Sequence, residues 1–83
     1  MNIEQRLLAL LDAALGLHGR TAQFTLATPL LGSVPELDSM AILAVLTAME
    51  EQFDVHIDDD EIDGAIFATV GTLAAFVERK VGA

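Results

Sequence analysis

The chain has 83 residues, a formal net charge of -9 and no cysteine, and 53% of its residues are hydrophobic. This length predicts one domain spanning residues 1–83, the lack of cysteine excludes disulfides and thiolate metal sites, and no apolar run approaches the roughly 18 to 20 residues of a membrane span. Because residues 21–78 hold no basic side chain and every acid except Glu4 and Asp12, we expect the surface to repel nucleic acid and to attract basic protein patches.

Residues 3–17 are expected to form the first helix, since apolar side chains recur there at helical spacing. Asn2 precedes this run and is a suitable N-cap, with Gln5 three residues further on. Gly16, His18 and Gly19 then supply stop signals.

Residues 18–37 predict a long loop, because they contain two prolines and Gly32 and show no sustained hydrophobic period. A connection of this length in a small domain needs side chains of its own that anchor it. The candidates are its apolar residues, Phe24, Leu26, Leu30, Leu31, Val34 and Leu37.

The second helix is expected from Ser39 to about Phe53, a stretch without glycine or proline and strong in helix propensity. Its first half is apolar nearly all round. Some of these apolar side chains, Met40 and Leu43 among them, should therefore remain exposed.

After a short extended piece at residues 55–57, the four acids at 58–61 suit the positive N-terminal end of a short third helix that runs to about Phe67. Thr69 can cap a fourth helix, whose expected inner face is Val70, Leu73, Ala74, Val77 and Val81. The predicted fold class is all-α: a small four-helix bundle of three longer helices and one short one, with a long loop between helices 1 and 2.

Ser39, preceded by Asp38, has two interpretations. An Asp-Ser pair before a helix is typical of an N-cap, so one of the two side chains should accept a hydrogen bond from the first turn. A helix N-terminus also favours a phosphate attached to a side chain, because free N–H groups and the positive end of the dipole meet there. Taken alone, the pair is explained by capping.

The wider pattern, from about residue 30 to the end, resembles the acyl carrier proteins. The residues that carry the resemblance are Asp-Ser-Met at 38–40, Met-Glu-Glu-Gln-Phe at 49–53 and Thr-Val-Gly-Thr-Leu at 69–73. In that family the serine is esterified by the phosphate of 4′-phosphopantetheine, which a magnesium-dependent transferase takes from coenzyme A. The resemblance thus implies attachment at Ser39, with Asp38 and Met40 as flanking contacts.

The resemblance also implies a non-catalytic carrier, whose prosthetic arm holds acyl groups as thioesters for transfer between enzymes. A cysteine-free chain suits this role, because the arm then holds the only thiol. The expected partners are a phosphopantetheinyl transferase and acyl ligases or acyltransferases with basic docking patches. We expect the protein to be cytoplasmic, since the first residues lack the features of a secretory signal. We also expect it to be a monomer.

Departures from the family pattern indicate a specialised carrier. The family's second helix presents acids soon after the serine, where this chain has Ala41 and Ala44, so partners should make a more apolar contact. The sequence resembles stand-alone bacterial carriers found with exosortase and exopolysaccharide systems, which implies a specialised lipid, polyketide or exopolysaccharide-linked pathway. The expected partner-binding residues are Glu36, Met40, Leu43, Glu50, Glu51, Asp59 and Asp60.

A set of apolar residues would, in a carrier, line a core between the later helices that opens to admit an acyl chain. Ordinary packing also explains every one of them. The set is Ile42, Leu46, Ile57, Ile62, Ile66 and Leu73.

Metal binding and catalysis have weaker support. Counted from Asp59, the acidic run has the early spacing of a calcium loop, but Val70 stands where the bidentate glutamate should be, so no metal site is expected. His18 and His56 suggest a hydrolase with Ser39, but the serine lacks a Gly-x-Ser-x-Gly elbow and no catalytic residues are expected.

An alternative function from another class remains. The chain would then be a small acidic helical interaction module, in which Ser39 only caps a helix and the exposed Met40 and Leu43 bind a partner. A peptidyl carrier domain is a further variant, although the pair of glycines customary before its serine is absent.

Overall fold

The computed structural model describes residues 2–82, and within them the chain is helical, with a single isolated β-bridge. The α-helices are α1 (Ile3–Leu15), α2 (Ser39–Phe53) and α3 (Val70–Gly82), and the 3-10 helices are η1 (Arg20–Gln23), η2 (Asp59–Glu61) and η3 (Gly64–Phe67). The predicted all-α class and the three longer helices are confirmed. The short third helix, expected up to about Phe67, takes a different form, as two separate 3-10 turns.

Capping residues set both ends of helix α1. The Asn2 side chain accepts a hydrogen bond of 2.8 Å from the backbone N–H of Gln5, as expected for an N-cap. The helix ends two residues earlier than predicted, because Gly16 adopts a left-handed conformation with φ of 65° and donates its N–H to the Asp12 carbonyl.

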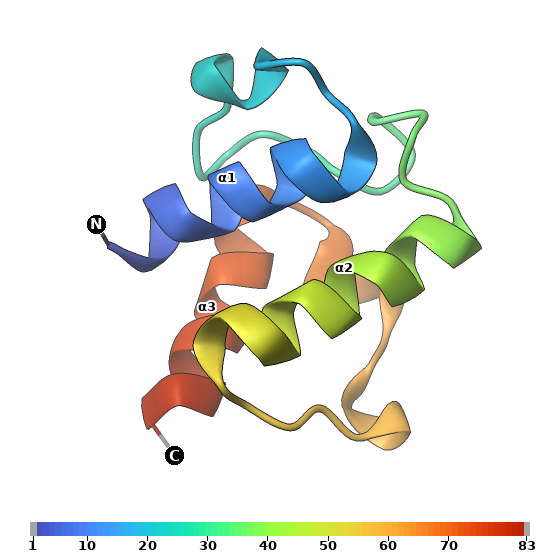
Figure 1. Cartoon of the computed structure of the whole chain (residues 1–83). Coiled ribbons are helices and arrows are strands. Elements are labelled where there is room, and N and C mark those ends of the chain that lie inside the picture. The colour runs from blue at the N-terminus through green and yellow to red at the C-terminus, as the bar shows by residue number, and fades with distance from the viewer. Residues whose placement is uncertain (1, 83) are drawn as a thin grey trace.

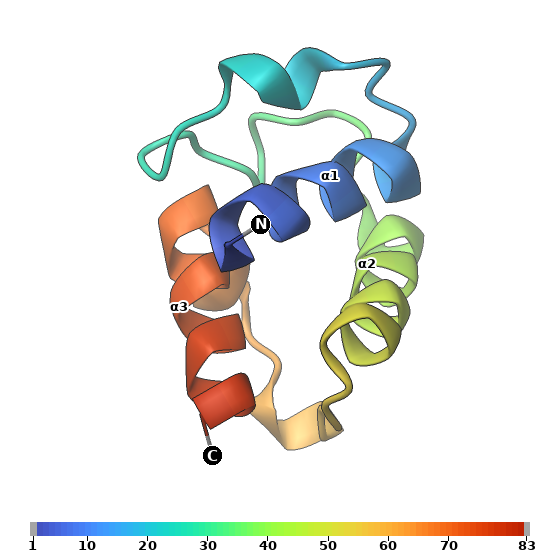
Figure 2. The same cartoon turned by 60° about the vertical axis from the view of Figure 1, so that its left-hand side comes forward.

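The three α-helices enclose one hydrophobic core. Figure 2 shows α1 lying across α2 and α3, which stand on opposite sides; residues 54–69 cross the end away from α1 and then return toward α1, where α3 begins. The side chains that are almost fully enclosed come from all three helices, from the long loop and from η3. They are Leu7, Leu11, Leu17, Leu30, Val45, Met49, Phe67, Val70, Leu73 and Val77.

The long loop, residues 16–38, passes over α1 (Figures 1 and 2) and is fixed to the start of α3 by backbone hydrogen bonds. The N–H groups of Leu30 and Leu31 donate to the carbonyls of Ala68 and Phe67, at 3.0 and 2.9 Å. In the opposite direction, Val70 and Gly71 donate to Thr28 and Leu26, at 3.0 and 2.8 Å. We call this contact between residues 26–31 and 67–71 the loop seam.

The loop is anchored by only some of the predicted side chains. Leu30, Val34 and Leu37 are buried as expected. Leu26 and Leu31 do not anchor it, since they are 51% and 45% exposed; the loop seam aligns the backbone there. Val81, expected on the inner face of the last helix, is also exposed.

The acidic segment forms two turns because its acids bind nearby backbone groups. Asp58 and Glu61 form a reciprocal capping box around η2. Two residues further on, Asp63 Oδ1 accepts hydrogen bonds from the N–H groups of Ala65 and Ile66, at 2.9 and 3.3 Å. These two bonds begin a second turn, η3. Short acidic side chains that bind the backbone locally compete with a continuous helix.

Gly71 is required by the loop seam rather than by a turn. A methyl group at this position would lie 2.9 Å from the Leu26 carbonyl oxygen, which is backbone and cannot rotate away. We expect Gly71→Ala to destabilise the protein, since overpacking costs about 1–3 kcal/mol and exceeds the roughly 1 kcal/mol that alanine gains over glycine in a helix. Urea unfolding measures the difference.

Gly82→Ala is the matched control, because Gly82 belongs to the same helix and nothing lies within 4 Å of the methyl group it would add. Its stability should equal or exceed that of the wild type. A Gly71→Ala protein as stable as wild type would show that the seam has room to shift.

Candidate functional site

The start of α2 is capped by Asp38 and not by Ser39. The Asp38 side chain accepts a hydrogen bond of 2.8 Å from the Ala41 N–H. Ser39 is the first helical residue, and its side chain is exposed to solvent. The interpretation of Ser39 as the cap is therefore wrong, and its hydroxyl is available for another role.

The first turn of α2 can accommodate a phosphate on the Ser39 hydroxyl. An α-helix leaves its first N–H groups without intrahelical acceptors. Among residues 2–82, the Asp38 side chain takes one of these donors, the Ala41 N–H, and the Asp38 carbonyl accepts the first intrahelical bond, from Ile42 at 2.9 Å. The N–H groups of Ser39 and Met40 remain for an anion, which the helix dipole also favours.

Glu36, predicted to bind partners, is already engaged within the protein. Its carboxylate forms an ion pair with the guanidinium of Arg20, from the 3-10 helix η1. Arg20 also donates through Nε to the Leu17 carbonyl, at 3.2 Å. The pair ties the loop together just before Ser39 and neutralises one of the two acids beside the serine.

The outward face of α2 after Ser39 is apolar. Met40 is 79% exposed and Leu43 is 64% exposed, which confirms that these side chains stay in solvent. Ala44, one turn after Met40, is also exposed, and Ala41 is partly buried. Large apolar side chains exposed together on one helix face are typical of an interaction surface.

One of the four acids predicted to bind partners on the later part of the chain differs from the other three. Glu51, Asp59 and Asp60 are exposed, as a docking surface requires. Glu50 instead accepts a hydrogen bond of 2.8 Å from the Ile57 backbone N–H, and so holds the segment after α2 against the helix. Glu50 thus positions the backbone that leads to the exposed acids.

The exposed acids are presented by a segment that is fixed at its far end by Glu61. Both carboxylate oxygens of Glu61 lie 2.9 Å from Lys80 Nζ on α3. A hydrogen bond from the Asp58 backbone N–H, and then Lys80, lower the pKa of Glu61. Neither Lys80 nor Glu61 is free for a partner.

The residues predicted for an acyl pocket belong to one continuous core. Leu46, Ile57, Ile66 and Leu73 are buried, whereas Ile42 and Ile62 pack on the edge of the core and are partly exposed. These side chains come from α2, η3, α3 and the segment between α2 and η3. Helix packing accounts for their burial.

The geometry separates His56 from Ser39. His56 lies beyond the C-terminal end of α2, with Nε2 2.7 Å from Asp58 Oδ1, whereas Ser39 begins that helix. Fifteen helical residues separate the two ends by about 22 Å. Within residues 2–82 no group of three or more His, Cys, Asp or Glu side chains is arranged to hold a metal ion.

No helix in the described part of the chain has the length and apolar character needed to cross a bilayer.

Comparison with solved structures gives a full-length match. The chain is similar to the solution structure of a holo acyl carrier protein from Nitrosomonas europaea, with a TM-score of 0.92 and 44% sequence identity. The alignment covers 100% of both chains. No family model matches the sequence, and no curated protein matches it either.

The cap assignment can be tested by two single substitutions in the unmodified protein. Asp38→Ala should lower the free energy of unfolding by about 0.5–2 kcal/mol, because it removes the N-cap of α2. Ser39→Ala should change it by no more than about 0.5 kcal/mol, as at most exposed sites. Chemical denaturation measures both, and an equal loss in the two variants would mean that Ser39 shares in capping.

Proposed function

The chain belongs to the acyl carrier protein family, and on this basis we propose that Ser39 is the residue to which 4′-phosphopantetheine is attached. The observation that carries the proposal is an exposed Ser39 hydroxyl at the first position of α2, with the capping role taken by Asp38. The N–H groups of Ser39 and Met40 would hold the phosphate, and Asp38 and Met40 would flank the arm. When bound, the group supplies a thiol that holds acyl groups as thioesters.

The protein's own contribution to transfer is to present this arm to enzymes and not to catalyse the reaction. Asp38 fixes the first turn of α2, and the Arg20–Glu36 pair and the loop seam fix the loop before it. A rigid base with an exposed attachment point suits a carrier that must serve more than one active site. The chain has no cysteine, so its side chains offer no thiol that competes for the acyl group.

We propose that partner enzymes dock through two features, one beside Ser39 and one at the far end of α2. Met40 and Leu43 provide an apolar contact, and the exposed Glu51, Asp59 and Asp60 attract basic patches. Glu36 and Glu50 serve by positioning the backbone. The partners are a phosphopantetheinyl transferase and acyl-transferring enzymes.

The apolar contact supports a specialised pathway. Alanine at positions 41 and 44 leaves the first two turns of α2 uncharged, so charge steering acts from the far end of the helix. Enzymes that require acids next to the serine would bind this surface poorly. A lipid, polyketide or exopolysaccharide-linked pathway with dedicated enzymes fits such a surface.

Attachment is tested by incubating the purified chain with coenzyme A, magnesium and a broad-specificity phosphopantetheinyl transferase. The intact mass should increase by one phosphopantetheine group, and one free thiol should appear in a chain that had none. Ser39→Ala should show neither change.

Ser33→Ala is the matched control, because Ser33 is also exposed and lies six residues before the proposed site. It should be modified as fully as wild type. No mass increase in the wild type would refute the carrier function, and an increase that persists in Ser39→Ala would refute the site.

We also propose that the core between α2, η3 and α3 admits the acyl chain, along Ile42, Leu46, Ile57, Ile62, Ile66 and Leu73. Partial exposure of Ile42 and Ile62 supports entry at the edge of the core. Each methylene that becomes buried contributes about 0.8 kcal/mol, less the energy needed to open the core.

Acylated forms with two, six and eight carbons should therefore melt at progressively higher temperatures, as measured by circular dichroism. The reference is the same protein with an unacylated arm. Identical melting temperatures at all lengths would indicate that the acyl chain remains outside the core.

A further inference from the structure

The chain has four basic side chains, and three of them are used within the protein. Arg6 donates to the Gln52 carbonyl at the end of α2 and lies over the Phe53 ring, 4.6 Å from its centroid. Arg20 pairs with Glu36, and Lys80 pairs with Glu61.

Arg79 is different. Within residues 2–82 it has no ion-pair partner, and its guanidinium lies 5.8 Å from the centroid of the Phe76 ring. Thirteen acids outnumber four basic side chains in this protein, yet the exposed Arg79 guanidinium has no acidic partner within the described residues. It can therefore donate hydrogen bonds to a ligand.

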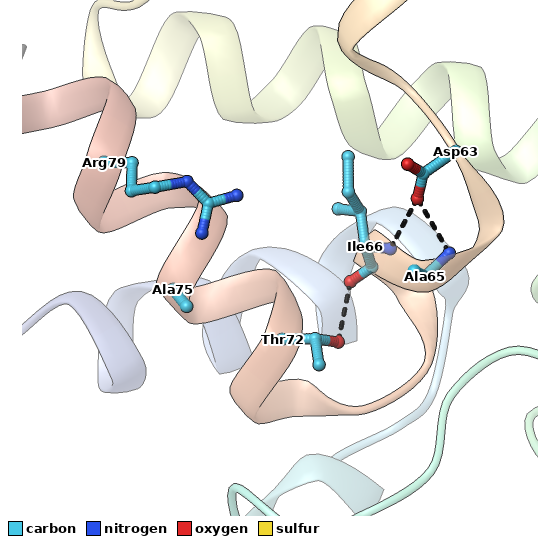
Figure 3. Close-up of a pocket in the computed structure, with 6 residues that line it drawn as sticks. All are labelled: Asp63, Ala65, Ile66, Thr72, Ala75 and Arg79. Carbon is cyan, nitrogen blue, oxygen red and sulfur yellow. Dashed lines mark hydrogen bonds between the residues drawn. The ribbon is translucent and has the colours of Figure 1, made fainter.

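Arg79 lines a cleft of about 250 Å³ between η3 and the outer face of α3. Figure 3 shows the side chain reaching from α3 toward the turn that carries Ile66. The walls between the two are apolar, formed by Ala65, Ile66 and Ala75, and Thr72 lies at one end. The cleft is smaller than the roughly 300 Å³ at which sites for drug-sized ligands begin, so it suits a single side chain.

The cleft has two other polar side chains. Thr72 Oγ1 donates to the carbonyls of Ile66 and Thr69, both at 2.9 Å. Asp63 Oδ1 accepts the two N–H groups that start η3, and its carboxylate forms no ion pair with Arg79. The guanidinium is thus the group of the cleft that can pair with a carboxylate of a ligand.

The cleft adjoins an uncharged surface. Residues 21–35 and 64–77 contain no charged side chain, and the loop seam holds the two segments side by side. The exposed Leu31 lies at this border, with its Cδ2 at 3.7 Å from a methyl group placed on Gly64, next to Ala65. An apolar centre with a charged group at its rim is the usual anatomy of a protein interface.

We infer that the Arg79 cleft and Leu31 form a second docking surface, which binds a protein segment that presents an apolar side chain next to a carboxylate. The carboxylate pairs with the Arg79 guanidinium, and the apolar side chain packs on Ala65, Ala75 and Leu31. Charge complementarity supports this occupant: the exposed acids Glu51, Asp59 and Asp60 select basic partners, whereas Arg79 offers a cation that has no ion-pair partner within residues 2–82. A second copy of the chain is disfavoured, because two molecules of charge -9 repel each other.

The surface is tested by titrating the isotopically labelled full chain with N-acetyl-leucyl-glutamate amide and following backbone and Arg79 Nε–H resonances by NMR. We expect saturable shifts at Ala65, Ala75 and Arg79. The dissociation constant should be at least about tenfold lower than for N-acetyl-leucyl-glutamine amide, which has the same shape without the charge. Equal affinity for the two peptides, or no saturable shift with either, would overturn the inference.

Two variants and one control locate the binding. Arg79→Gln removes the cation, and Ala75→Glu supplies an internal acid one helical turn before Arg79, so both should abolish the saturable shifts. Thr47→Glu makes the same change in net charge at an exposed position on α2 and should bind as wild type. Ala75→Glu places an acid four residues before Arg79, where the two side chains form a favourable pair on the helix surface, so this variant should fold. It therefore still tests the inference if Arg79→Gln fails to fold.

Two further results would also overturn the inference. Binding that survives in Ala75→Glu would place the peptide elsewhere, and shifts at the cleft that depend on protein concentration without peptide would assign the surface to a second copy. The test uses the unmodified chain and is independent of the attachment at Ser39, since Ser39→Ala should bind the peptide like the wild type.

Discussion

Backbone hydrogen bonds between residues 26–31 and 67–71 fix the long loop between α1 and α2, which has no regular secondary structure of its own beyond η1. A loop of more than twenty residues has many conformations, and burial of Leu30, Val34 and Leu37 alone would not set the direction in which it leaves the core. Four bonds of 2.8 to 3.0 Å set that direction. The entry to α2, the position of Ser39 and the start of α3 all depend on this contact, and Gly71 permits it because it has no side chain.

The acids of this protein fall into two groups with different roles. Asp38, Glu50, Asp58, Glu61 and Asp63 bind backbone N–H groups, and Glu36 pairs with Arg20. The exposed acids, Glu51, Asp59 and Asp60 among them, are left for the surface. Several of the acids that make up the net charge thus already have partners within the protein, where they hold short turns in place.

Helix periodicity, capping residues and the exposure of Met40 and Leu43 could be predicted from the sequence, because each depends on side chains within a few positions. The choice of Asp38 over Ser39 as the cap was left open, since both residues favour that position and only geometry decides. The single short helix expected up to Phe67 was wrong, because the acids there bind the backbone locally. The roles of Glu36 and Glu50, and the lack of an ion-pair partner for Arg79 within residues 2–82, depend on which residues the fold brings near, and no local pattern signals them.

The loop seam also bears on how the protein is made. Residues 31 and 67 are paired, and the whole of α2 lies in the chain between them, so closing this contact carries the entropy cost of a loop of about 36 residues. During synthesis α2, its Asp38 cap and the Arg20–Glu36 pair can form early, but the bonds of the loop seam can form only after the residues up to Gly71 have emerged from the ribosome. The loop that leads to Ser39 is therefore fully fixed only when most of the chain has been made, although it lies in the first half of the chain.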